Sequence, residues 1–158
     1  NFKNTIIIMT SNLGSHIIQG HFETMNENNK HHVYSASKAE VMELLKRTIR
    51  PEFLNRIDEI IMFTPLSMND IQKIVELQLN QLIEKTKEMG ITLQYSTDAL
   101  QYIAKHGYDP QFGARPVKRF IQKMVLNELS IYILSGKVHK DSTILLDSFG
   151  DGLVFRNI

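Results

Sequence analysis

The stretch TPLSMNDIQKIVELQLNQLI, residues 64–83, divides the sequence into two parts. Before it, apolar residues come in short runs. After Ser67 they recur every three or four residues, as on one face of a long helix. Ser67 and Asp70 are suited to cap the first turn of that helix. The change of pattern predicts a domain boundary, with one part at 1–65 and the other at 66–158.

The second part has the pattern of a small α+β domain. The long helix is expected to end at Gly90, and the alternation in residues 91–95 predicts a strand. A shorter helix is predicted at 97–106, and another starts at Pro116, since proline is favoured at the first helical position. The runs STILLD and GLVFRN, joined by a glycine-containing turn, predict two closing strands. We therefore expect helices and a three-stranded sheet.

The first part carries two apolar runs, at 5–9 and 59–63. Three consecutive isoleucines in the first run favour a strand covered on both faces, as in a parallel sheet. Two strands do not make a stable sheet. We therefore interpret residues 1–65 as the end of a larger α/β domain that begins upstream, and expect an exposed apolar edge in this chain.

Between these two runs the sequence predicts a loop and a helix. Residues 19–37 have no helical or alternating pattern, which predicts an exposed loop. Ser37 and Glu40 have the spacing of a capping box, so a helix is expected to begin there and to stop at Pro51. The histidines of the loop lack carboxylate or cysteine partners at helical spacing, so no metal site is predicted.

Composition argues against several classes of function. The 158 residues carry a net charge of +1, which gives no global reason to expect a nucleic-acid or membrane-surface partner. The apolar runs are far shorter than the ~20 residues that cross a bilayer. There is no cysteine, so thiol and disulfide chemistry are absent and a reducing compartment such as the cytoplasm fits.

Two arginines stand out as candidates for binding phosphate. Arg115 lies at a helix start, where a cation is unfavourable but a phosphate is favourable. The alternative for Arg115 is a salt bridge with Asp109 or another carboxylate. Arg56 either pairs with Asp58 or Glu59, or is presented to the phosphate of a neighbouring subunit as an arginine finger.

Asn12 and a stripe of basic residues at 115–123 each allow two interpretations. Asn12 ends the first predicted strand, where α/β sheets bind ligands, but asparagine also closes turns through its own side chain. Arg115, Lys118, Arg119 and Lys123 either contact a nucleic-acid backbone or form the solvated face of an amphipathic helix. The second reading is favoured because the opposite face is apolar.

Two short motifs only superficially resemble nucleotide-binding sequences. In SGKVH, residues 135–139, Val138 stands where a P-loop requires serine or threonine. In IDEII, residues 57–61, the acids precede the apolar strand, whereas in a Walker B motif they follow it. Neither is therefore interpreted as a phosphate or magnesium site.

Three segments together resemble the second AAA+ module of the Clp ATPases, most closely that of the ClpB-type disaggregases. They are TSNLG (10–14), RPEFLNRIDE (50–59) and GYDPQFGARPVKR (107–119), in the order found in the family. The resemblance covers nearly all of the chain and fades at about 16–38. It implies an α/β fragment of a parallel AAA+ sheet, followed by an α+β small (lid) domain with helices and a three-stranded sheet.

The resemblance also implies roles for five residues. Asn12 corresponds to the sensor-1 residue, which orients the attacking water, and Arg56 to the arginine finger, which acts in trans. Arg115 corresponds to sensor 2, which couples nucleotide state to movement of the small domain. Ala114 and Ile74 correspond to residues that line the adenine pocket.

The function implied is that of an ATP-dependent chaperone. Its homohexamers thread unfolded or aggregated polypeptides with the help of a co-chaperone, and the parent chain binds ATP or ADP with Mg²⁺. The Walker A and Walker B motifs and the pore loop are expected upstream of Asn1. These 158 residues alone are therefore expected to need no cofactor and to be inactive as an ATPase.

Two alternatives remain at this point. A ClpC- or ClpA-like unfoldase that feeds a peptidase is disfavoured, because in IQGHF Gly20 lacks the flanking residues of the peptidase-docking tripeptide. A function of a different class is a non-enzymatic interaction module that uses the basic helix at 115–123.

Overall fold

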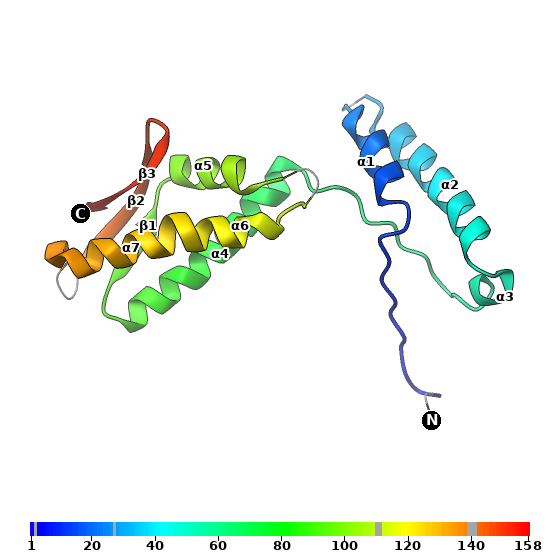
Figure 1. The fold of residues 1–158 in the computed structure, drawn as a ribbon, viewed down its shortest axis with the longest axis horizontal. Coiled ribbons are helices and arrows are strands. Elements are labelled where there is room, and N and C mark those ends of the chain that lie inside the picture. The colour runs from blue at the N-terminus through cyan, green and yellow to red at the C-terminus, as the bar shows by residue number, and fades with distance from the viewer. Residues whose placement is uncertain (2, 27, 110–111, 139–141) are drawn as a thin grey trace. The chain divides into compact units, whose positions relative to one another are not determined.

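The computed structural model describes residues 1, 3–26, 28–109, 112–138 and 142–158, which form two compact units (Figure 1). Unit 1 is Asn1–Pro65 and unit 2 is Leu66–Ile158. Each unit is described by itself. None of the described helices is both long and apolar enough to cross a membrane.

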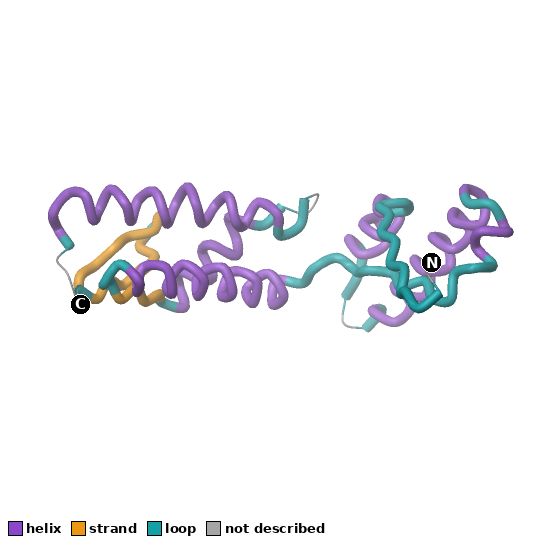
Figure 2. Tube along the Cα trace, turned by 90° about the horizontal axis from the view of Figure 1, so that it is seen from below, coloured by secondary structure: helices purple, strands orange, loops and turns teal. Residues whose placement is uncertain are grey.

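Unit 2 contains the predicted three-stranded sheet, with strand order β1-β2-β3. Strand β1 (Thr92–Tyr95) is parallel to β2 (Thr143–Phe149), and β2 is antiparallel to β3 (Gly152–Asn157). Alternate residues of β2, Ile144 and Leu146, are fully buried. Figure 2 shows these strands beside the helices of the same unit.

The helices of unit 2 follow the predicted order. They are α4 (Met68–Glu88), α5 (Thr97–Gly107), and one long helix made of α6 (Arg115–Ile121), η1 (Gln122–Leu126), α7 (Asn127–Tyr132) and η2 (Ile133–Lys137). A capping box starts α4: the Asp70 amide donates to Ser67 Oγ at 3.2 Å, and the Ser67 amide donates to Asp70 Oδ2 at 3.0 Å. Gly90, at positive φ, follows α4 as predicted, and Gly136, also at positive φ, ends the regular part of the other long helix.

A wide turn inside the long helix explains the spacing of its buried residues. Val117, Ile121, Val125 and Leu129 are all buried and are four residues apart. In a regular α-helix each four-residue step overshoots a full turn by about 40°, so three steps would carry the last residue about 120° away from the first. Segment η1 is π-helical, and the Asn127 amide bonds to the Gln122 carbonyl five residues back. The wider turn keeps all four side chains on one face.

This explanation predicts that the long helix tolerates the loss of one residue within η1. Deleting the exposed Lys123 restores regular α-helical phase, so the free energy of unfolding should change by about 1 kcal/mol or less. Deleting the exposed Glu76 in the regular α4 rotates half of its buried face by about 100° and should cost at least ~3 kcal/mol. Urea unfolding followed by circular dichroism compares the two deletions, and equal losses would contradict the explanation.

Asp147 joins three elements of unit 2. Its Oδ1 accepts a hydrogen bond from Ser96 Oγ at 2.6 Å and from the Ser148 amide at 2.9 Å, and Arg156 lies 3.5 Å from Oδ2. Ser96 is also the N-cap of α5, since its Oγ accepts from the Ala99 amide at 3.1 Å. The hydrogen bond from Ser96, followed by that from the Ser148 amide, lowers the pKa of Asp147. Burial opposes this lowering, and the charge of Arg156 adds a smaller contribution to it.

The lowered pKa of Asp147 predicts a stability that decreases in acid. The folded state favours the carboxylate, so the stabilisation is present above the unfolded pKa of about 3.9 and is lost as pH falls through the lower folded value. The difference in unfolding free energy between wild type and Asp147→Asn should therefore shrink below about pH 4. Denaturant titrations from pH 7 to pH 2 measure it, and a pH-independent difference would refute the assignment.

Unit 1 contains helices where the sequence had predicted a loop. Helix α1 (Ser15–Glu23) and helix α2 (Lys30–Thr48) pack side by side (Figure 1). The exposed loop predicted at 19–37 and the helix start predicted at Ser37 are therefore wrong. Ser37 is buried within α2, where its hydroxyl donates to Met62 Sδ at 4.0 Å.

Asparagine side chains make the short connection that the sequence reading missed. The backbone N–H of Asn29 donates to the side-chain Oδ1 of Asn26 at 3.0 Å, and the backbone N–H of Asn26 donates to the side-chain Oδ1 of Asn29 at 2.6 Å. These bonds close a turn without glycine or proline. The polar cluster is thus confined to a few residues between two helices.

The two predicted strands of unit 1 are extended but unpaired among the described residues. Ile6 is 88% exposed and Phe63 is 82% exposed, and their neighbours Ile7, Ile8 and Ile61 are also exposed. The buried strands expected at 5–9 and 59–63 are therefore not formed within this chain, whereas the exposed apolar edge is confirmed. A strand becomes buried only when neighbouring strands and covering helices are present.

Candidate functional site

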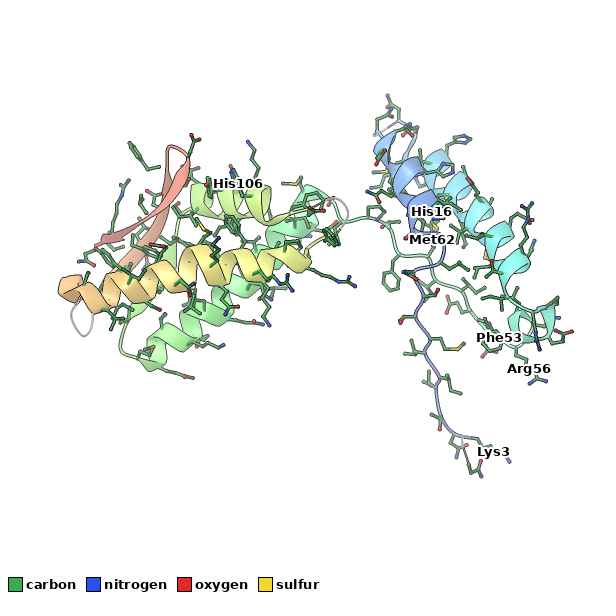
Figure 3. All side chains as sticks on the ribbon, in the orientation of Figure 1. Lys3, His16, Phe53, Arg56, Met62 and His106 are labelled. Carbon is green, nitrogen blue, oxygen red and sulfur yellow. The ribbon has the colours of Figure 1, made fainter. Side chains whose placement is uncertain are left out.

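The segment Arg50–Arg56 forms a compact turn around the one-turn helix α3 (Pro51–Leu54). The Arg50 carbonyl accepts from the Phe53 and Leu54 amides at 3.0 and 3.1 Å, and the Arg56 amide donates to the Phe53 carbonyl at 3.0 Å. Pro51 suits the first helical position. The turn brings Arg50, Phe53 and Arg56 to one shallow depression, which Pro51 and Glu52 also line. Figure 3 shows Phe53 and Arg56 at this end of unit 1.

Arg56 is exposed, and no described carboxylate lies within ion-pair distance of it. The alternative of a salt bridge with Asp58 or Glu59 is thus not formed in the structure. The guanidinium keeps its planar fork of donors available, which suits bidentate binding of a phosphate or carboxylate.

Asn12 is exposed at the end of the extended segment that leads into α1. Its backbone carbonyl accepts from the Ser15 amide at 3.1 Å, and Ser11 Oγ accepts from the Leu13 amide at 3.1 Å. Among the described residues the Asn12 side chain makes no hydrogen bond. The turn is therefore closed by the backbone of Asn12 and by Ser11, and the amide of Asn12 is available to a ligand.

Gly14 fixes the position of this turn against α2. Its φ is +80°, and a Cβ built on it would lie 3.1 Å from Val41 Cγ2. Any larger residue would meet backbone strain at this φ, and Val41 would have to shift by a few tenths of an ångström. The glycine of TSNLG thus has a physical role in holding the start of α1, and the turn of Asn12 before it, close to α2.

This role predicts opposite effects of two glycine substitutions in unit 1. Gly14→Ala should loosen α1 and lower the hydrogen-exchange protection of its amides by about 10-fold or more. Gly20→Ala lies within α1 with open space around it, so it should leave protection unchanged or raise it, since alanine favours helix. Exchange mass spectrometry on both variants makes the comparison, and equal protection would contradict the role of Gly14.

In unit 2, a tight loop leads to Arg115, the first residue of α6. Asp109 and Gly113 form an isolated bridge, with the Gly113 amide donating to the Asp109 carbonyl at 2.6 Å. Arg115 is exposed and forms no ion pair with any described residue, so the predicted alternative of a salt bridge to Asp109 is not present. Pro110 and Gln111 of the same motif lie outside the described residues.

The two residues expected at an adenine pocket both belong to unit 2. Ala114 is half-buried and packs against the core, and Ile74 is half-buried on α4 between the fully buried Ile71 and Val75. Asn12 and Arg56 belong to unit 1. The five candidates thus fall into two sets, with two residues in unit 1 and three in unit 2. The depression that holds Arg56 does not include Asn12.

The basic stripe is the solvated face of the long helix. Arg115, Lys118, Arg119 and Lys123 are all exposed, whereas Val117 and the other core residues of that helix are buried. This confirms the preferred interpretation of an amphipathic helix. Among the described residues, no group of three or more His, Asp or Glu is placed to hold a metal ion.

The chain matches two family models that together cover most of its length. Residues 66–146 match the model of the C-terminal, D2-small domain of ClpB protein, and residues 1–60 match that of an AAA domain (Cdc48 subfamily).

This chain belongs to the ClpB family.

Curated relatives and a solved structure agree with that membership. The chain is 54% identical to chaperone protein ClpB of Bacteroides thetaiotaomicron, over 99% of this chain and 18% of that protein. It is 49% identical to the mitochondrial chaperone protein ClpB4 of Arabidopsis thaliana, over 92% of this chain and 15% of that protein. The S. cerevisiae Hsp104–ADP complex aligns with a TM-score of 0.75 at 34% identity, covering 92% of this chain and 24% of that chain.

These matches confirm the predicted resemblance and fold class. The Hsp104 alignment includes the helices and mixed sheet found here, and the relatives named above are ClpB proteins and not ClpA or ClpC. The chain spans only 18% of the length of the Bacteroides relative.

Sequence reasoning missed two residues at the Arg56 depression. Arg50 and Phe53 line it with Arg56, although only Arg56 was singled out. The sequence carried only part of the signal: Pro51 indicates a helical turn after Arg50. A spacing of six residues does not by itself place two side chains on one side of a helix, so the shared depression is known from the structure.

Proposed function

We propose that this chain is the C-terminal part of an ATP-dependent protein disaggregase. The proposal follows from membership of the ClpB family and from the exposed, unpaired guanidinium of Arg56 on the α3 turn. The longer protein would assemble as a homohexamer and thread unfolded or aggregated polypeptides, together with a co-chaperone. Residues 1–65 would complete the large AAA+ subdomain, and residues 66–158 would form the small lid domain.

Arg56 is the residue that carries the proposed chemistry. As an arginine finger it would contact the γ-phosphate of a nucleotide held by the adjacent subunit and stabilise the charge that develops during hydrolysis. Asn12, whose side chain is not engaged in the turn, would orient the attacking water. Both residues are exposed, as such contacts require.

Unit 2 would report the state of the nucleotide. Arg115, exposed at the start of the long helix, would contact the phosphate of the bound nucleotide. When that phosphate is released, the helix and with it the small domain would move. Ala114 and Ile74, both half-buried, would line the adenine. Because α6 is packed on the core through Val117, a displacement of Arg115 would move the whole unit.

The described residues fit the nucleotide only in part. They supply cations for phosphate at Arg56 and Arg115, but no group placed to hold a metal ion. We therefore propose that the Mg²⁺ ligands and the Walker motifs belong to another part of the longer protein. Bound ATP would supply the anhydride bond whose hydrolysis drives threading. A cytoplasmic location is proposed, although the relatives include mitochondrial proteins.

The proposal predicts a strong effect of Arg56 on turnover in the full-length protein. Arg56→Ala should lower kcat for ATP hydrolysis by about 10³-fold, because the transition-state charge loses its partner. Nucleotide binding, measured by fluorescence of a labelled ADP, should persist. The matched control is Arg47→Ala, which removes the same charge from the exposed last turn of α2.

Other results would count against the proposal. Unchanged turnover in Arg56→Ala would reject the arginine-finger role. A full-length protein without any ATPase activity would reject the disaggregase itself.

A further inference from the structure

We propose that Arg50 is a second cation that acts with Arg56 on the phosphates of the neighbouring subunit's nucleotide, and that Phe53 anchors the same contact. This inference rests on the proposed function, because it assigns additional residues to the site of the arginine finger. The partner is a second copy of this protein carrying a nucleoside triphosphate.

The first argument is geometric. Arg50, Phe53 and Arg56 line one depression together with Pro51 and Glu52. The positions of these residues follow from local hydrogen bonds: the Arg50 carbonyl holds the Phe53 and Leu54 amides, and the Phe53 carbonyl holds the Arg56 amide. Two arginines that are six residues apart in sequence are therefore held on the same side of one short turn.

The second argument is electrostatic. Neither Arg50 nor Arg56 forms an ion pair with a described residue, although both are exposed. Glu52 is the acidic residue that lines the depression, so two positive side chains and one negative leave a net charge of +1 there. A polyphosphate carries several negative charges and presents planar groups of oxygens that guanidinium forks bind in pairs. The depression thus has the sign and the donors that such an anion requires.

The third argument concerns Phe53. Its side chain is 47% exposed, although its neighbour in the turn, Leu54, is half-buried. Contacts between proteins concentrate their energy in aromatic and arginine side chains that become buried together. An exposed ring at the same depression as two arginines therefore fits a protein–protein contact, in which the ring is buried and excludes water around the phosphates.

The experiment for Arg50 uses the full-length hexamer. Arg50→Ala should lower kcat for ATP hydrolysis by about 10- to 100-fold, the effect of losing one charged hydrogen-bonding partner. Arg50→Lys should fall between wild type and Arg50→Ala, because lysine keeps the charge but not the fork. Arg47→Ala is the control of equal charge change outside the depression and should keep kcat within about twofold of wild type.

The experiment for Phe53 measures assembly. Phe53→Ala should raise the protein concentration at which half of the subunits are hexameric by about 10-fold, and Phe53→Leu should restore most of the loss. Sedimentation velocity in the presence of ATP follows this midpoint. A circular-dichroism spectrum of each variant confirms that the chain remains folded.

The outcomes separate this inference from the proposed function. If Arg56→Ala abolishes turnover but Arg50→Ala behaves like Arg47→Ala, Arg50 is no second cation and the arginine finger stands. If Phe53→Ala assembles like wild type, the anchor is wrong. If Arg56→Ala itself has no effect, the proposed function fails and this inference fails with it.

Discussion

The buried face of the long helix is the contact on which the rest of unit 2 depends. Val117, Val125 and Leu129 are almost wholly buried, and their helix packs against α4 and α5. Gly107 permits the closest approach, since a Cβ there would lie 3.2 Å from the Val117 Cα. The first turn of α6 is thereby fixed on the end of α5. The backbone of Arg115, at the start of α6, is therefore fixed as well, although the Arg115 side chain forms no ion pair with a described residue.

Unit 1 is held together by a different balance of forces. Its two main helices contact each other through a few residues, among them Val33 and Val41, while the extended isoleucines face solvent. Extended segments without neighbours leave backbone donors and acceptors to water and bury no apolar surface. Such a unit gains stability from whatever pairs with its extended segments. The proposed position at the end of a larger sheet would supply that pairing.

Much of unit 2 could be predicted from sequence because local and global signals agree there. Ser67 and Asp70 cap α4, Gly90 and Gly136 end helices, and alternation marks the strands. The wide turn η1 could not be named in advance, since an average period of four residues fits both a curved apolar face and a π-helical turn. In unit 1 the asparagine turn at 26–29 concealed two helices, because its side chains replace the usual glycine or proline.

For the candidate site, the sequence indicated which residue types could bind a phosphate. The structure showed which of these side chains are exposed and free to bind one. An arginine beside Asp58 and Glu59 could be predicted equally well as part of an ion pair or as a free cation, and only the structure distinguishes the two. The deciding factor is local: Arg56 lines the depression that Arg50 and Phe53 share, and among the described residues it forms no ion pair with the acids that follow it. Because the turn is closed by its own backbone hydrogen bonds, it can hold this arrangement before any partner is bound. Less conformational entropy is then lost when an anion or a neighbouring subunit binds, and this preorganisation makes so small a segment suitable for a contact in trans.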